Sequence, residues 1–313
     1  MTSIQDRRKS RYSKKKIVSN DDLYKSNDPS VSIDSVKVPE QSIKIETAIN
    51  KRPKRKNKKL LKATFDYQKM APEYSKENVN QQLGNYRCAM EYLAHINFQN
   101  PNSDLIIDRF KDIIYNYPNI DISSFANKNA AILNTAIIRQ MQYAYGQKYL
   151  GVLYIIQGGM GLLGAMFLDS AMRFENIRSF DVNGSCQFLA DEFMKDELLK
   201  DWRFKSCEKD MFEIDYNENE FTTRLPDGSF SEPYNEVPGT IINTQVSHMV
   251  NFQDWWKMIP DTKRVVVVGE TGNVPRPFPS SQNFNLQFPM NFEQYTGVIT
   301  VEDKQYFMKI GMK

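Results

Sequence analysis

A glycine-rich segment follows a strongly apolar run and is the clearest sign of ligand chemistry in the chain. The apolar residues 149–156 lead into the segment 157–164, QGGMGLLG. Within it, Gly159, Gly161 and Gly164 have the spacing G-x-G-x-x-G. Glycine suits such a turn because the backbone can bend tightly and approach a ligand with no Cβ in the way. A position after a strand and before a helix favours a nucleotide- or nucleoside-binding loop.

A carboxylate follows this loop at a suitable distance. Asp181 closes the second predicted strand, 20 residues after Gly161. A carboxylate in that place can accept hydrogen bonds from ribose hydroxyls. The alternative is a tight strand-to-helix turn in which Asp181 caps its own loop. Because the loop and the carboxylate occur together and in the expected order, we favour nucleoside binding.

A second group of reactive side chains follows the fourth predicted strand. Asn243 and Thr244 end that strand, and His248 lies just beyond it. The ordinary pKa of histidine suits a general base near neutral pH, although a structural or helix-capping role for His248 remains an alternative. Ser247 is adjacent, but the sequence has no G-x-S-x-G elbow, and we therefore reject a hydrolase.

Short apolar runs alternate with helical stretches over residues 149–313, which predicts parallel strands joined by right-handed crossovers. The last two strands are joined only by Glu302-Asp303-Lys304, which favours an antiparallel hairpin. We predict an α/β fold with a Rossmann-like, mostly parallel seven-stranded sheet and a C-terminal antiparallel hairpin. The expected strands are 149–156, 177–182, 203–207, 240–243, 264–268, 295–301 and 305–313, and the expected helices are 162–174, 185–199 and 251–258.

A helical segment is expected at 66–148, as a cap or flank to this domain. In its first helix, Leu83, Tyr86, Met90 and Leu93 recur with helical spacing and predict one buried face. A second helix is expected to begin after Ser103 as N-cap and run through Tyr115. A third helix is expected over 129–145, with Leu133, Ile137, Met141 and Ala144 on its buried face.

The charge of the chain is distributed unevenly. The whole chain carries a formal charge of +3, but residues 1–62 hold 18 basic and 7 acidic residues, about +11 (18 − 7). The remainder holds 23 basic and 31 acidic residues, about −8 (23 − 31). Residues 1–65 are therefore expected to be a basic, disordered arm. Its part 7–62 could bind nucleic acid or another anionic surface, or serve only as a solvated tail.

Composition limits the remaining possibilities. The chain of 313 residues suits one substantial domain with appended segments. Its 3 cysteines are widely spaced and its histidines number only 2, so we expect free thiols, a reducing intracellular (cytoplasmic) compartment and no metal site. No apolar run is long enough to suggest a membrane span. The oligomeric state cannot be predicted from these features.

The order of these features resembles the class I (Rossmann-fold) methyltransferases that use S-adenosylmethionine. The resemblance covers the glycine loop, the segment 179–183, Asp210-Met211 after the third strand, the segment 241–244 and the closing hairpin. The stretch 243–260 also resembles uncharacterised methyltransferase-like proteins of bacteriophages, so the protein could be virus- or phage-encoded.

The resemblance implies a role for each of these positions. Gly158, Gly159 and Gly161 would face the methionine part of the cofactor, and Asp181 would face the ribose. Asn183, in the same segment as Asp181, is also expected to bind the cofactor. Asp210 and Met211 would border the adenine. Asn243 and Thr244 would lie beside the site of methyl transfer, with His248 as base. The sequence departs from the family pattern at Ile155 and Gln157, where an acidic residue and a glycine are common.

Two other functions fit the same residues. The glycine spacing and Asp181 also suit an NAD-dependent oxidoreductase, although no Tyr-x-x-x-Lys or His-Asp catalytic pair is evident. The third hypothesis is a non-enzymatic scaffold or particle component that keeps the methyltransferase fold. We favour methyl transfer, with nucleic acid slightly preferred among the acceptors because of the basic arm.

Overall fold

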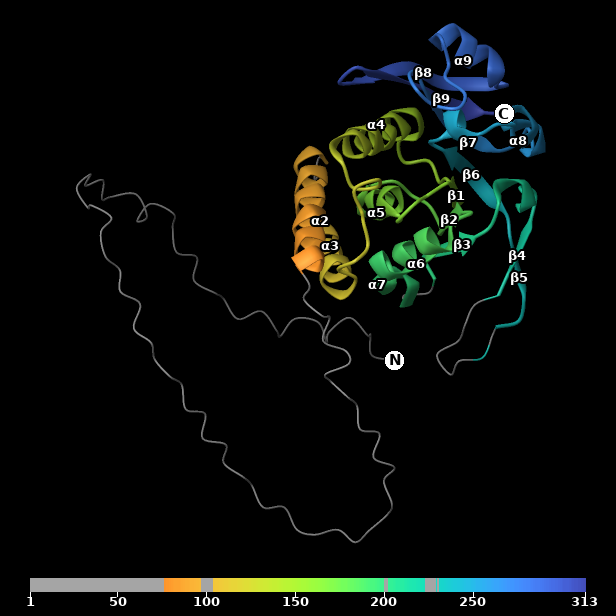
Figure 1. Cartoon of the computed structure of the whole chain (residues 1–313). Coiled ribbons are helices and arrows are strands. Elements are labelled where there is room, and N and C mark those ends of the chain that lie inside the picture. Colours follow the sequence, from red (N-terminus) through yellow and green to blue (C-terminus); the bar gives the residue numbers. More distant parts are fainter. Residues whose placement is uncertain (1–75, 97–103, 200–201, 223–228, 230) are drawn as a thin grey trace, which may run out of the picture. The chain divides into compact units, whose positions relative to one another are not determined.

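The computed structural model describes residues 76–96, 104–199, 202–222, 229 and 231–313. These residues all fall within one compact unit, Phe65–Lys313. The expected basic arm 1–65, residues 66–75 of the helical segment and the proposed N-cap Ser103 lie outside the described residues. The helices and strands of the described part are shown in Figure 1.

A seven-stranded sheet organises the described residues, with the strand order β3-β2-β1-β6-β7-β9-β8. The first five strands in this order are parallel, whereas β9 is antiparallel to both of its neighbours, β7 and β8. The terminal hairpin thus inserts its last strand into the sheet, and the predicted fold class is confirmed. The strands are β1 Val152–Ile156, β2 Ile177–Asp181, β3 Phe204–Glu208, β6 Pro238–Asn243, β7 Arg264–Glu270, β8 Phe292–Val301 and β9 Lys304–Met312.

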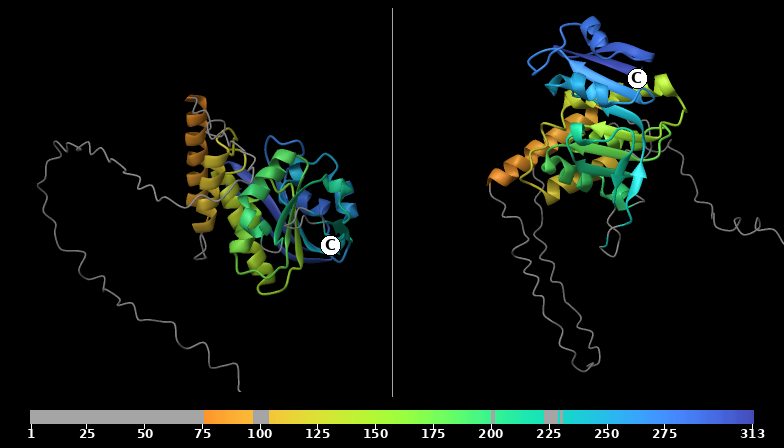
Figure 2. Two further views of the ribbon diagram at one scale, coloured as in Figure 1. Left: turned by 90° about the horizontal axis from the view of Figure 1, so that it is seen from below. Right: turned by 90° about the vertical axis from the view of Figure 1, so that its right-hand side faces the viewer.

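Helices cover both faces of the sheet because alternate strand residues point to opposite sides. The helices on the two faces are α4 Lys128–Tyr145, α5 Leu162–Asp169, α6 Gly184–Phe193, α8 Phe252–Met258 and α9 Ser281–Gln287. In β1, Leu153 and Ile155 pack with α4, α5 and α6, whereas Val152, Tyr154 and Ile156 pack with α8 and α9. Figure 2 shows these layers from two directions.

The predicted helical segment forms three helices, α2 Lys76–His95, α3 Asp104–Asn116 and α4. The first two pack on the same side of the sheet as α4, where α2 contacts α4 and α3 contacts α6. The buried face of α4 contains Ile137 and Met141, as expected. Of the predicted face of α2, only Leu93 packs against the core. The rest of that face is wrong, because Leu83 and Met90 are 62% and 65% exposed and Tyr86 is exposed as well. The face that packs inward carries Asn85, Ala89, Tyr92 and Ile96.

Two predicted helices are shorter than expected. The helix predicted over 162–174 ends at Asp169, because Ser170 is extended and its hydroxyl donates to the carbonyl of Phe167. The helix predicted over 185–199 is divided at Met194 into α6 and α7 Lys195–Leu199. A small antiparallel sheet of β4 Asn219–Phe221 and β5 Tyr234–Glu236 was not predicted. Its Glu236 forms a buried ion pair of 2.7 Å with Arg178 of β2.

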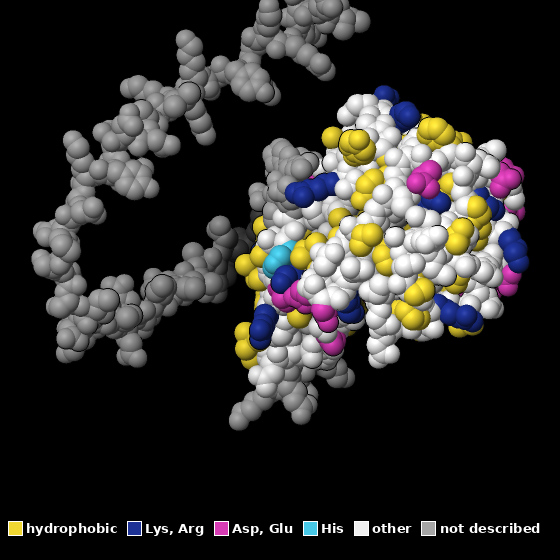
Figure 3. Space-filling model, turned by 90° about the horizontal axis from the view of Figure 1, so that it is seen from above, with side chains coloured by type: hydrophobic (Ala, Val, Ile, Leu, Met, Phe, Trp, Pro, Cys, Tyr) yellow, Lys and Arg dark blue, Asp and Glu magenta, His cyan; other side chains and the backbone are white. Residues whose placement is uncertain are grey.

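The described surface mixes charges of both signs. On the face drawn in Figure 3, basic and acidic side chains are interspersed rather than gathered by sign. No helix of the described part is long and apolar enough to cross a bilayer. The described residues also contain no group of three or more His, Cys, Asp and Glu side chains arranged to hold a metal ion.

Candidate functional site

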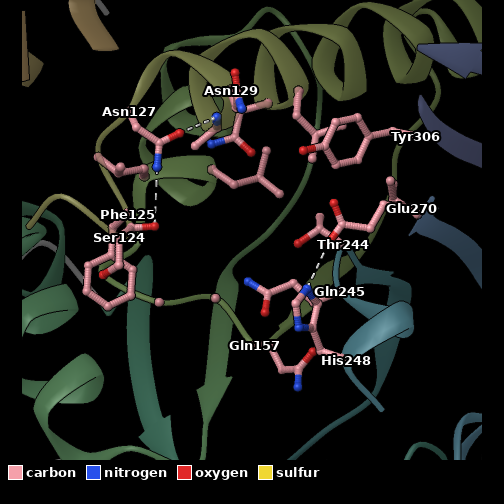
Figure 4. Close-up of a pocket in the computed structure, with 18 of the residues that line it drawn as sticks. Ser124, Phe125, Asn127, Asn129, Gln157, Thr244, Gln245, His248, Glu270 and Tyr306 are labelled. Carbon is pink, nitrogen blue, oxygen red and sulfur yellow. Dashed lines mark hydrogen bonds and ion pairs between the residues drawn. The ribbon is translucent and has the colours of Figure 1, made fainter. Parts of the chain in front are cut away.

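A pocket of about 420 Å³ opens at the carboxyl ends of β1, β6 and β7. Its volume lies within the range of small-molecule sites, about 300–1,000 Å³, and the carboxyl ends of parallel strands are where α/β sheets bind ligands. Figure 4 shows how the lining side chains converge from the loop before α4 and the start of that helix, from the loop after β1, from the turn after β6, from the end of β7 and from β9. The residues used below are Ser124, Phe125, Asn127, Asn129, Gln157, Gly158, Gly159, Thr244, Gln245, His248, Glu270, Lys304 and Tyr306.

The glycine loop follows β1 directly and has an unusual backbone. Gln157, Gly159 and Gly161 have positive φ angles of 56°, 54° and 82°, a region that favours glycine over residues with a Cβ. The amide of Gly161 donates to the carbonyl of Gly158 at 3.1 Å and closes the turn. A Cβ on Gly158 would lie 1.9 Å from the hydroxyl of Ser179 on β2. The loop therefore needs glycine in order to lie against the next strand.

Asp181 lies beside this loop, as the sequence predicts. Its Oδ2 accepts a hydrogen bond from the amide of Gly159 at 3.2 Å, and its Oδ1 accepts from the amide of Asn183 at 3.0 Å. The carboxylate is half-buried. The thiol of Cys186 also hydrogen-bonds to this carboxylate. Since a carboxylate offers about four acceptor positions, these three bonds leave acceptor capacity for a ligand's hydroxyl group, although Asp181 does not itself line the pocket.

Gly161 and Gly164 do not line the pocket. A Cβ on Gly161 would contact Phe204 of β3 at 3.2 Å, and a Cβ on Gly164 would approach the same ring to 2.9 Å. These two glycines allow α5 to pack closely against the sheet. Gly161 therefore serves packing and closes the turn, and its contact with the cofactor stays a prediction.

The other predicted cofactor-binding residues, Asn183, Asp210 and Met211, lie outside the pocket, and two of them cap short helices. The side chain of Asn183 accepts from the amide of Ser185 at the start of α6. The side chain of Asp210 accepts from the amide of Phe212 at the start of the 3-10 helix η3 Met211–Glu213. Asn183, Asp210 and Met211 follow β2 and β3, so they stand beyond the carboxyl ends of those strands. Their contact with a ligand stays a prediction.

Of the residues after β6, Thr244 and His248 line the pocket and Asn243 does not. Asn243 is fully buried. Its amide group donates to the sulfur of Met249 and accepts from the backbone of Gln245, so it holds the turn after β6. The side chain of Asn243 therefore does not face the pocket in this structure, and its expected place beside the site of methyl transfer stays a prediction.

His248 is paired with a carboxylate that the sequence analysis missed. Its Nε2 lies 2.9 Å from Oε1 of Glu270, the last residue of β7. Tyr306 of β9 also hydrogen-bonds to Glu270, and burial, followed by the charge of Glu270, raises the pKa of Tyr306 to about 12. Tyr306 therefore stays protonated at neutral pH. The position of Glu270 at the end of an apolar parallel strand is a signal that could have identified it.

Two further residues beside the loop were not predicted to bind a ligand. The Oε1 atom of Gln157 is buried and has no hydrogen-bond partner among the described residues. Such an atom costs free energy unless a ligand or water bonds to it. Phe125, from the segment between α3 and α4, covers the other side of the loop, where a Cβ on Gly159 would come within 2.9 Å of its ring.

No protein-family model matches the sequence, and no curated protein matches it. Similar solved structures include the magnesium protoporphyrin IX methyltransferase of Synechocystis PCC 6803 with bound S-adenosylmethionine, which has a TM-score of 0.43 and 10% identity over 65% of this chain and 90% of that one.

Two more solved structures have similar scores. The ribosomal protein L11 methylase of Lactobacillus delbrueckii subsp. bulgaricus has a TM-score of 0.38 and 12% identity, over 60% of this chain and 80% of that one. The geranyl diphosphate C-methyltransferase of Streptomyces coelicolor A3(2) has a TM-score of 0.38 and 11% identity, over 57% and 78%.

Proposed function

We propose that the protein is an S-adenosylmethionine-dependent methyltransferase. One observation carries the proposal: the glycine loop after β1 is hydrogen-bonded to Asp181 at the end of β2 and borders the pocket that holds His248. A loop of exposed backbone beside a carboxylate suits the adenosine and methionine parts of one ligand. The insertion of β9 between β7 and β8 supports the class I methyltransferase resemblance drawn from the sequence.

The residues present suit this cofactor. Gly158 and Gly159 have no side chain between the loop backbone and the pocket, and Asp181 keeps free acceptor positions for ribose hydroxyls. The unpartnered Oε1 of Gln157 can accept a hydrogen bond from the ammonium group of the methionine part. Gln157 would thereby replace the acidic residue that the family often has late in the first strand. Asn183, Asp210 and Met211 would border the adenosine part.

When bound, S-adenosylmethionine supplies a methyl group on a positively charged sulfur. The chain's own contribution is to position an acceptor in line with that group and to exclude competing water. Thr244 and His248 lie on the β6 side of the same pocket, opposite Ser124 and Phe125 (Figure 4). An acceptor that enters between these two sides would meet the methyl group near His248.

Nucleic acid is the acceptor we favour. The support is the concentration of positive charge in residues 7–62, which would attract a phosphate backbone to a body with about 8 excess negative charges (31 − 23). The charges on the face in Figure 3 are interspersed, so that face offers no single-sign patch for the same purpose. We further propose an intracellular role and, from the resemblance of 243–260, a bacteriophage origin.

Calorimetric titration of the full-length protein with S-adenosylmethionine and with NAD tests the proposal. We expect S-adenosylmethionine to bind with a dissociation constant in the micromolar range and NAD to give no heat of binding. Binding of NAD alone would favour the oxidoreductase hypothesis. Binding of neither ligand would favour a scaffold that keeps the fold without the activity.

A further inference from the structure

The pocket contains a histidine whose orientation is fixed by a carboxylate. His248 Nε2 lies 2.9 Å from Glu270 Oε1, and the side chain of His248 is 43% exposed while that of Glu270 is 11% exposed. The described residues provide no other hydrogen-bond partner for this imidazole. Since a carboxylate only accepts at neutral pH, the neutral imidazole carries its proton on Nε2. Nδ1 is then left with a lone pair that can accept a proton.

Glu270 is itself held firmly at the end of β7. Its amide donates to the hydroxyl of Ser247 at 2.7 Å, and that hydroxyl donates to the Glu270 carbonyl at 3.3 Å. Tyr306 hydrogen-bonds to the same carboxylate, and Lys304 Nζ lies 4.0 Å from its second oxygen. These contacts join β7, the turn after β6 and β9. They restrict the carboxylate to the position that orients His248.

The charges on the pocket lining nearly cancel. Among the described residues, Glu270 and Lys304 are the only carboxylate and ammonium groups that line it, and they lie beside each other. The amides of Asn129 and Gln245 face the same space (Figure 4). Such a lining offers hydrogen bonds to a polar group but no surplus of positive charge for a phosphate. It therefore suits an uncharged group at the point of reaction, whatever larger molecule carries that group.

We propose that His248, positioned by Glu270, is the proton acceptor of the site and that the methyl acceptor is an uncharged hydroxyl or N–H group. This inference rests on the proposed methyltransferase function. The acceptor oxygen or nitrogen bonds to the methyl carbon as the carbon–sulfur bond breaks, and that bond's electron pair stays on sulfur. The acceptor's proton passes to Nδ1 of His248, so the charge lost by the sulfonium is regained as an imidazolium. Glu270 stabilises that imidazolium and is a positioning residue.

The tautomers of the histidines give a first test. The chain has only 2 histidines, His95 and His248, so the imidazole nitrogens of the ¹⁵N-labelled full-length protein are easily assigned by NMR. His95 Nδ1 lies 2.8 Å from the carbonyl of Glu91 and is expected to carry the proton. His248 is expected to be the opposite tautomer, with the proton on Nε2. A proton on Nδ1 of His248 would overturn the proposal.

The rate of chemical modification gives a second test. Bound cofactor should change this rate at His248, whereas it would not change the rate at a histidine with a purely structural role. Diethyl pyrocarbonate attacks an imidazole nitrogen that has a free lone pair, and mass spectrometry separates the two histidines. We expect bound S-adenosylmethionine to slow modification of His248 about tenfold at a concentration about ten times its dissociation constant, as mass action requires. His95 is the internal control and its rate should not change. Equal rates at His248 with and without bound cofactor would overturn the proposal.

Substitution of Glu270 tests the positioning role. Glu270→Leu has no acceptor for the Nε2 proton, so the imidazole should lose its preference for that tautomer and show a mixture of the two neutral forms. Glu270→Asp keeps a carboxylate and should keep the proton on Nε2. A proton still held fully on Nε2 in Glu270→Leu would contradict the role of Glu270. Calorimetry on the same samples separates the two proposals, because absent binding of S-adenosylmethionine by the wild-type protein would instead defeat the proposed function.

Discussion

Gly159 is the residue on which cofactor binding most depends. Its positive φ and the nearby ring of Phe125, 2.9 Å from where a Cβ would lie, leave no room for a side chain. We expect Gly159→Ala to weaken binding of S-adenosylmethionine about tenfold, which corresponds to about 1.4 kcal/mol. The reason is that either the loop or Phe125 must move. Isothermal titration calorimetry measures the change.

Gly146 provides a matched control for this substitution. Its φ of 56° is close to that of Gly159, but a Cβ there would meet nothing within 4 Å. Both alanine variants should lose about 1–2 kcal/mol of unfolding free energy from backbone strain, whereas only Gly159→Ala should lose affinity. Equal affinities for the two variants would mean that the loop does not contact the cofactor.

The close approach of Gly158 to Ser179 predicts a coupling between the two residues. A Cβ on Gly158 would meet the Ser179 hydroxyl, which is buried and has no hydrogen-bond partner among the described residues. We expect Gly158→Ala to cost about 1–3 kcal/mol through overpacking and Ser179→Ala to be nearly neutral. The double variant should regain most of the loss in urea unfolding. Strictly additive effects would contradict this account.

The sequence identified some of the site residues and missed others for a physical reason. Gly159 and Asp181 could be predicted because they lie in two consecutive β-α units, where the glycine spacing and the distance to the carboxylate can be read from the sequence. Glu270 and Tyr306 could not, because they reach His248 only through the order of the strands in the sheet. Asn243 is buried and bonded to Met249, a contact that spacing in the sequence does not reveal.

At the level of elements, the buried face of α2 was predicted wrongly because a polar residue, Asn85, lies at its centre. Asn85 is 1% exposed, donates to the carbonyl of Ile120 and accepts from the amide of Ile122. Tyr92, about two helical turns further along the same face, is fully buried. A buried asparagine bonded to a distant loop leaves no trace in hydrophobic periodicity. The apolar side chains of Leu83 and Met90 therefore suggested the opposite face.

This correction of the α2 face can be measured. Tyr92→Ala should lower the unfolding free energy by about 3–5 kcal/mol, because it removes a fully buried aromatic ring. Leu83→Ala should change it by no more than about 0.5 kcal/mol, because that side chain is mostly exposed. Denaturant unfolding of both variants decides between the faces. The reverse order of costs would restore the face predicted from the sequence.

The strands were predictable to within a few residues because continuous apolar runs mark strands that are buried on both faces. The ends of helices were less predictable. The helix α5 stops at Ser170 and the α6 segment breaks at Met194, and both depend on local backbone geometry rather than on composition. The β4–β5 pair is held by the buried contact between Arg178 and Glu236, which joins residues far apart in the sequence.

At the scale of the whole molecule, the separation of charge between residues 1–62 and the remainder predicts a salt-dependent interaction. Deletion of residues 1–62 removes about 11 net positive charges (18 − 7). We expect weaker binding to nucleic acid and a smaller slope of log affinity against log salt concentration, because fewer counterions are released. Fluorescence anisotropy across a salt series measures both. An unchanged affinity and slope would show that residues 1–62 do not contribute to nucleic-acid binding.

The central claim is that the glycine loop and Asp181 together hold S-adenosylmethionine. Hydrogen–deuterium exchange of the full-length protein, with and without S-adenosylmethionine, tests this claim most directly. We predict slower exchange in peptides that cover residues 157–161 and 181–183 when the cofactor is bound, because the ligand stabilises the backbone it contacts. Protection confined to other parts of the chain, with none in these two segments, would contradict the account.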